Sequence, residues 1–224
     1  MRHVALFFAI AATLLAAWGT QTPVRAASEE EVAKPRIDEH APQKPSELVG
    51  KPLPPLSGPA TISHGLLNLQ KYTHDLVFLK QPDGKLIIEN GRAKTRMDTY
   101  ALVMSFFATY CGPCVREIPT FNKIAASYAD KPIRFLYVNV DVEKSADEVK
   151  AFAQQKGISV EMVFPSVSQT IKTYQIETLP RIVVADRDGV VRKVIMGFQD
   201  NLTAQLDAEI RDILKGAPAA PKPN

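Results

Sequence analysis

Cysteine is almost absent from this chain of 224 residues, in which only Cys111 and Cys114 occur. Two cysteines cannot form the framework of several disulfides that holds many small secreted proteins together. The pair therefore either acts as a unit or consists of two unrelated thiols.

An excess of charge of either sign is also absent. The chain has 27 Lys and Arg against 24 Asp and Glu, a formal net charge of +3. Arg2 and Arg25 fall in a segment that we expect to be removed, which leaves 25 basic and 24 acidic residues. So small a charge argues against a nucleic-acid-binding surface and against a basic membrane-binding patch. Hydrophobic residues at 46% and charged residues at 23% exclude a disordered chain, a collagen and a multispan membrane protein.

A long hydrophobic run occurs only near the N-terminus. After the basic start Met1-Arg2-His3, residues 4–18 are apolar except for Thr13, which suits the core of a signal peptide and is short for a membrane span of about 20 residues. We expect residues 1–26 to be a signal peptide cleaved after Ala26 and the protein to be periplasmic or otherwise exported; the alternative is an uncleaved membrane anchor. No cysteine follows the run, so a lipid-modified N-terminus is excluded. Export would place the two cysteines in an oxidising compartment.

Proline divides the remainder of the chain. Seven prolines fall within residues 27–60, which predicts an extended linker, and three fall within the tail 216–224. A binding role for the Pro-Leu-Pro-Pro run of the linker is the alternative. Residues 61–215 are long enough to form a single domain with its own core.

The domain alternates strand and helix patterns, which predicts an α/β fold with a mixed central sheet. Residues 76–79 and 86–88 flank a Pro-Asp-Gly turn and predict an N-terminal β-hairpin. Further strands are expected at 100–107, 133–140, 160–164, 182–185 and 190–195, and helices at 114–128, 145–155, 167–174 and 202–214. The helix at 145–155 has a Ser cap with Glu148 three residues later.

The two cysteines lie where a buried strand meets a helix. Cys111 and Cys114 are three residues apart at the predicted helix start. Unpaired amide groups and the helix dipole stabilise a thiolate there and lower its pKa from about 8.5 to roughly 3.5–7.5. The first thiol at the tip would be reached by a substrate disulfide, and the second could then attack the mixed disulfide. Pro113 suits the first helical turn because its missing N–H has no partner there.

Two other interpretations of the pair are weaker. A structural disulfide across so short a loop removes little entropy from the unfolded chain. Half of a zinc site would need further ligands, but the sequence has no second cysteine pair and its four histidines all precede Cys111. The strand–CxxC–helix context favours redox chemistry.

With these residues in view, the sequence resembles the thioredoxin superfamily and, within it, the exported TlpA/ResA/DsbE-like thiol–disulfide oxidoreductases. The segment from Cys111 to Pro119 matches each fixed position of that branch's pattern, Cys-x-Pro-Cys-x-x-Glu-x-Pro. A strand–helix insertion at about 142–165 and the run from Tyr174 to Pro180, which resembles the approach to the superfamily's cis-proline, agree with this. The resemblance covers about residues 95–215 and implies a thioredoxin-like fold.

The resemblance also implies roles for individual residues. Cys111 would be the attacking thiolate, Cys114 the resolving thiol and redox partner, and Glu117 a carboxyl that shuttles the proton of Cys114 or tunes its pKa; a solvated surface charge is the alternative for Glu117. Pro180 would be cis, which leaves the backbone of Leu179 free to pair with a substrate strand. Substrate contacts would come from Tyr110, Gly112, Pro113, Leu179 and Pro180.

Some positions depart from the superfamily. Tyr110 and Phe107 stand where Trp is usual. Ser105 replaces the buried Asp of thioredoxins, so proton transfer from the second thiol cannot use that carboxylate. Arg181 places a cation next to the expected cis-proline, where Thr is common.

The resemblance implies an exported oxidoreductase that exchanges disulfides with protein substrates and needs no cofactor or metal. The Cys-Gly-Pro-Cys dithiol favours a reductase, of the kind that serves cytochrome c maturation, fed by a membrane thiol–disulfide electron donor; a monomer is expected. The alternatives are an oxidase or isomerase, or a thioredoxin-fold binding module or metal chaperone. The absence of histidine after Cys114 weighs against a copper chaperone.

Overall fold

The computed structural model of the chain describes residues 34–38, 42, 46–63 and 65–215. The predicted signal peptide at 1–26 and the tail at 216–224 lie outside the described residues. Among the helices of the described ranges, none has the length and apolar character needed to cross a membrane.

A mixed five-stranded sheet forms the centre of the domain, as predicted. Its strand order is β10-β9-β8-β12-β13, with β8, β9 and β10 parallel and with β12 antiparallel to both β8 and β13. The strands are β8 (Ala101–Phe107), β9 (Ile133–Asn139), β10 (Glu161–Val163), β12 (Arg181–Ala185) and β13 (Val191–Met196). Every residue of β8 is buried, as its continuous apolar run predicts for a strand covered on both faces.

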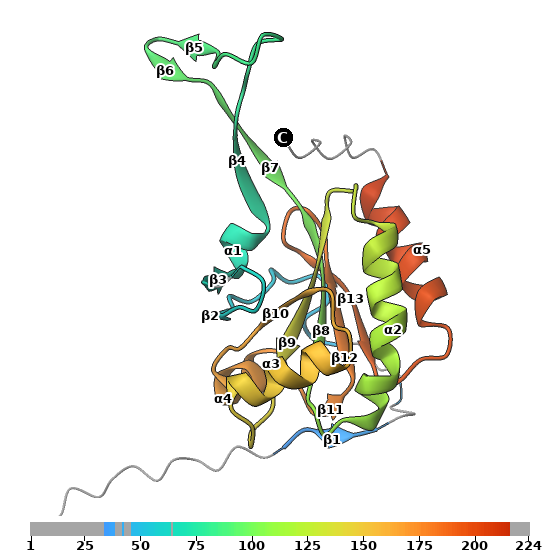
Figure 1. The fold of residues 1–224 in the computed structure, drawn as a ribbon. Coiled ribbons are helices and arrows are strands. Elements are labelled where there is room, and N and C mark those ends of the chain that lie inside the picture. Colours follow the sequence, from blue (N-terminus) through green and yellow to red (C-terminus); the bar gives the residue numbers. More distant parts are fainter. Residues whose placement is uncertain (1–33, 39–41, 43–45, 64, 216–224) are drawn as a thin grey trace, which may run out of the picture. The chain divides into compact units, whose positions relative to one another are not determined.

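Four helices flank this sheet at the predicted places. They are α2 (Gly112–Ser127), α3 (Ala146–Gln155), α4 (Val167–Thr173) and α5 (Leu202–Leu214). The Phe121 ring of α2 packs 4.8 Å from the Tyr137 ring of β9, and α5 lies beside α2 (Figure 1). Ser145 and Glu148 form a complete capping box at the start of α3. With β10, α3 occupies the expected insertion at 142–165.

The boundary predicted at residue 60 needs correction, because residues 46–60 pack on the domain. Leu48 and Leu56 are both 6% exposed. The N–H of Gly50 donates to the carbonyl of Val191 at 2.8 Å. The apolar residues between the prolines have enough surface to bury, which the proline count alone does not reveal.

The segment leading to the sheet is a small β2–β3 hairpin followed by a short helix. The elements are β2 (Ser57–Pro59), β3 (Leu66–Asn68) and α1 (Leu69–Tyr72). The Asn68 side chain accepts hydrogen bonds from the N–H groups of Gln70 and Lys71 and so caps this helix. The Tyr72 hydroxyl then donates to the carbonyl of Phe135 at 3.0 Å, which ties α1 to β9.

The predicted N-terminal hairpin is present, but its main strand partner differs from the prediction. The structure has β4 (His74–Phe78) antiparallel to β7 (Thr95–Thr99), with β5 (Ile88–Glu89) and β6 (Arg92–Ala93) paired between them. The turn at 82–84 closes a bridge between Lys80 and Leu86, whereas Leu76 pairs with Met97. We call residues 74–99 the β4–β7 ribbon, which extends beyond the sheet in Figure 1.

Candidate functional site

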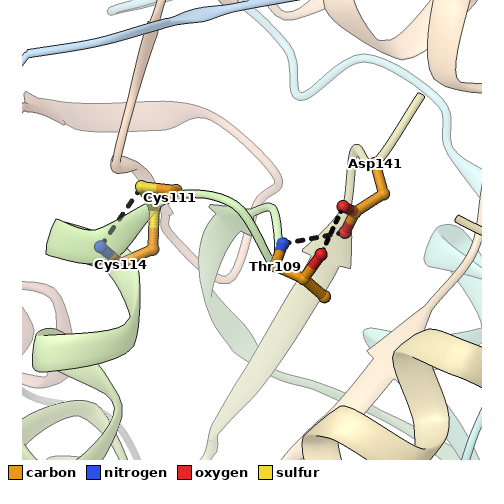
Figure 2. Close-up of a disulfide and its surroundings, with 4 residues drawn as sticks. All are labelled: Thr109, Cys111, Cys114 and Asp141. Carbon is orange, nitrogen blue, oxygen red and sulfur yellow. Dashed lines mark hydrogen bonds between the residues drawn. A yellow bond between two sulfur atoms is a disulfide. The ribbon is translucent and has the colours of Figure 1, made fainter. Parts of the chain in front are cut away.

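The two cysteines lie at the start of α2, directly after the carboxyl end of β8. Cys111 is the N-cap residue of α2, and its Sγ accepts a hydrogen bond from the N–H of Cys114 at 3.2 Å (Figure 2). The two residues form a disulfide with their Cα atoms 5.2 Å apart. The sulfur of Cys111 therefore lies where unpaired amides and the helix dipole stabilise a negative charge.

The exposure of the cysteines differs from the prediction. We expected the first thiol to be open to solvent, but Cys111 is 0% exposed and Cys114 is 4% exposed. Gly112 between them is exposed, and Pro113 is buried in the first helical turn. A substrate disulfide can therefore reach Cys111 only if a neighbouring segment moves.

Sequence reasoning missed Asp141, which holds the loop that leads to Cys111. Its carboxylate accepts hydrogen bonds from the Thr109 N–H at 2.9 Å and the Thr109 hydroxyl at 2.7 Å (Figure 2). The Asn139 amide donates to the same carboxylate at 2.6 Å. The polar residues Asn139 and Asp141 at the end of β9, which adjoins the end of parallel β8, are the signal that would have found it.

Glu117 is buried inside the protein, which contradicts the alternative of a solvated surface charge. It is 5% exposed, and its Oε1 atom has no hydrogen-bond partner within the described part of the chain. Burial raises the pKa of Glu117 from 4.5 to about 8, because the charged form loses its hydration there. Since Glu117 and Cys114 are three residues apart on α2, they share one face of the helix.

Glu117 lies near Tyr137, which pairs with Ser105 in the sheet. Ser105 is buried in β8 and pairs in register with Tyr137 of β9. The pKa of Tyr137 is raised, first by burial and then by the charge of Glu117, so the two side chains influence each other. Glu117 on α2 and Tyr137 on β9 therefore lie close enough to interact electrostatically beside Ser105 of β8.

The loop before β12 carries the expected cis-proline. The peptide bond between Leu179 and Pro180 is cis, and both residues are buried. We had predicted that the backbone of Leu179 would be free, but it is already paired. It belongs to β11 (Thr178–Leu179), which pairs in parallel with β1 (Arg36–Ile37). The pairing joins residues 142 positions apart, which no local sequence pattern predicts.

Arg181 directly follows Pro180, and Tyr110 directly precedes Cys111. Arg181 is 3% exposed and donates from Nη2 to the Ser46 hydroxyl at 3.3 Å. Its pKa is lowered by burial, which Glu177 opposes. The Tyr110 hydroxyl is buried, and burial together with Asp141 and Glu143 raises its pKa.

Comparisons with known proteins agree with this geometry. The sequence profile of the Redoxin family matches residues 82–210. The thiol-disulfide oxidoreductase ResA of Geobacillus thermodenitrificans is 32% identical over 119 residues, which are 52% of this chain and 67% of that protein. ResA of Bacillus anthracis is 29% identical over 110 residues, 49% of this chain and 61% of that protein. The alignments thus leave a third or more of each relative unmatched.

Solved structures show the same fold. A protein from Chlorobium tepidum, described as a thiol:disulfide interchange protein DsbE, has a TM-score of 0.58 at 22% identity, covering 74% of this chain and 97% of that one. The thioredoxin domain of a thiol-disulfide oxidoreductase from Bacteroides vulgatus has a TM-score of 0.56 at 15% identity, covering 74% and 99%. The chain therefore belongs to the Redoxin family, as a TlpA/ResA/DsbE-like member of the thioredoxin superfamily.

Proposed function

We propose that this protein is an exported thiol–disulfide oxidoreductase that exchanges disulfides with protein substrates and acts as a reductase. The observation that carries the proposal is the Cys111–Cys114 disulfide at the N-terminus of α2, on the same helix as the buried acid Glu117. The names of the ResA and DsbE relatives support the same chemistry.

The exchange follows from the positions of the two sulfurs. In the reduced protein the Cys111 thiolate attacks one sulfur of the substrate disulfide, forms a mixed disulfide and releases one substrate thiolate. The Cys114 thiolate then attacks Sγ of Cys111, which forms the Cys111–Cys114 disulfide and releases the second substrate thiolate. Two electrons pass from the protein to its substrate.

Glu117 is suited to handle the proton of Cys114. A group with a pKa of about 8 is close in pKa to an ordinary thiol at about 8.5, so a proton passes between them at little cost near neutral pH. Ser105 cannot perform this task, because a hydroxyl has no pKa in this range. We therefore assign Glu117 as the acid–base partner of Cys114.

The direction of electron flow is proposed from the dipeptide between the cysteines. Thioredoxin couples lie near −270 mV, against about −120 mV for the strongly oxidising DsbA. Equilibrating the Cys111–Cys114 couple with a glutathione buffer measures its potential. A value near that of thioredoxin is expected, with electrons supplied by a membrane thiol–disulfide donor and passed to disulfides of substrates such as apocytochrome c, whose cysteines are released as thiols. A value near that of DsbA would make the protein an oxidase.

The division of labour between the thiols is tested by trapping. Cys114→Ser is expected to accumulate a mixed disulfide through Cys111, because the resolving thiol is missing. Cys111→Ser is the matched control and is expected to trap no substrate. Adducts on Cys114 instead would reverse the two roles.

Export is tested by fluorescence. Trp18 is the only tryptophan of the sequence and lies in the proposed signal peptide. Protein recovered from the cell envelope is expected to show tyrosine emission alone, and tryptophan emission would mean that the segment is retained. Sedimentation of the same material tests the proposed monomer.

A further inference from the structure

Residues 34–38 occupy the backbone edge next to the cis-proline. The N–H of Arg36 donates to the carbonyl of Glu177 at 2.9 Å, and the N–H of Asp38 donates to the carbonyl of Leu179 at 3.2 Å. Leu179 directly precedes Pro180. The edge that an extended substrate segment would use therefore already carries a strand of the same chain.

The same residues also contact Tyr110, which directly precedes Cys111. Lys34 Nζ lies 5.5 Å from the centre of the Tyr110 ring, and Lys34 forms an ion pair with Glu143. Pro35, the next residue, is buried. We call residues 34–38 the strap. It contacts the residue before Cys111 at one end and the residue before Pro180 at the other, at the end of the domain where α2 begins (Figure 1).

We propose that the strap is a built-in competitor of the substrate, which covers Cys111 until an incoming extended segment displaces it. The proposal explains why Cys111 is 0% exposed although its position at the helix tip would otherwise present it. The effect of the strap on turnover rests on the proposed function, whereas its covering of Cys111 does not.

The chemistry of the strap suits a competitor that is displaced and not consumed. Its sequence, Lys-Pro-Arg-Ile-Asp, contains no cysteine, so it can occupy the edge without reacting. The strap is bound only weakly to the domain, since Arg36 is exposed, Ile37 is 45% exposed and the Lys34–Glu143 pair lies at the surface. A substrate segment that presents two N–H groups two residues apart can make the same hydrogen bonds and adds the mixed disulfide.

The test removes the two backbone donors of the strap in the full chain. The double variant Arg36→Pro/Asp38→Pro lacks both N–H groups, whereas Arg36→Ala/Asp38→Ala loses the same side chains and keeps both donors. The measured quantity is the rate at which dithiothreitol reduces the Cys111–Cys114 disulfide of the oxidised protein. We expect the proline variant to be reduced about tenfold faster than wild type, in line with the loss of two hydrogen bonds. The alanine variant is expected to stay within about twofold, the size of effect typical of surface substitutions. Equal rates in all three proteins would overturn the proposal, as would equal acceleration by proline and alanine.

A peptide supplied in trans gives an independent readout. A synthetic peptide of residues 32–40 is expected to slow the reduction of the proline variant, and the same peptide with proline at positions 36 and 38 is expected to have no effect. Slowing by both peptides, or by neither, would contradict the proposal. The variant Asp38→Pro alone, which removes only the bond to Leu179, is expected to accelerate reduction less than the double variant.

Turnover of a protein disulfide separates the two proposals. Insulin is reduced faster by the proline variant than by wild type if both proposals hold. If the dithiothreitol rates differ as expected and no form reduces insulin, the strap covers the disulfide and the proposed function is wrong.

Discussion

Glu117 has an acidic side chain in apolar surroundings, and this decides its charge during exchange. With a pKa raised to about 8 by burial, it is mostly protonated at pH 7 and can take or return a proton without a large change of energy. Above this pH its negative charge opposes the formation of a thiolate on the same helix. We therefore expect the group to limit the thiolate population most strongly in alkaline solution.

Glu117→Gln is expected to lower the apparent pKa of the reduced cysteine pair, because the amide never acquires a charge. Titration of thiolate absorbance in wild type and variant measures the shift, and the values belong to the coupled pair. Disulfide exchange is expected to lose part of its pH dependence. Asp130→Asn, which changes an exposed carboxylate beyond the end of α2, is the control. Superimposable curves for wild type and Glu117→Gln would remove Glu117 from the mechanism.

Asp141 acts on the site through the loop that it holds. Asp141→Asn leaves one acceptor oxygen where the carboxylate had two and turns an amide N–H towards the donors of Thr109. We expect a loss of about 1–3 kcal/mol in the free energy of unfolding, measured by urea denaturation with Asp130→Asn as the control. Unchanged stability would show that the three hydrogen bonds to Asp141 are dispensable.

At the scale of elements, local patterns predicted what local interactions determine. The apolar run of β8, the capping box of α3 and the cysteines at the start of α2 are each encoded within a few residues of sequence. Sequence reasoning failed where the partner lies far along the chain. It paired β4 with residues 86–88 instead of 95–99, left Leu179 without a partner, and did not foresee that the chain covers Cys111. Periodicity identifies a strand but carries no information on which strand lies beside it.

The β4–β7 ribbon is expected to open far more readily than the sheet. Leu76, Phe78 and Met97 are each more than half exposed, so the ribbon buries little apolar surface, whereas β8 is buried throughout. A two-stranded ribbon is only marginally stable on its own. Hydrogen exchange of backbone amides is expected to be at least about a hundredfold faster in the ribbon than in β8. Equal protection of both elements would mean that an unseen contact covers the ribbon.

For the whole molecule, the raised pKa of Glu117 makes stability depend on pH. The folded state holds this proton up to about pH 8, whereas the unfolded chain releases it near 4.5. The unfolded state therefore binds fewer protons between these values, and the free energy of unfolding decreases as the pH rises. The contribution to the free energy of unfolding that depends on a neutral Glu117 carboxyl is fully present below pH 4.5 and is lost as the pH rises through 8.

This dependence is measurable as a difference between wild type and Glu117→Gln, because the titrations that the two proteins share cancel. Relative to the variant, wild type is expected to lose up to about 1.4 kcal/mol per pH unit between about pH 4.5 and pH 8. Urea denaturation of both oxidised proteins at several pH values in this window provides the measurement, and the oxidised form removes the thiols from the titration. Parallel stability curves across the window would mean that Glu117 is ionised and solvated in the folded protein. Its assignment as the proton partner of Cys114 would then be wrong.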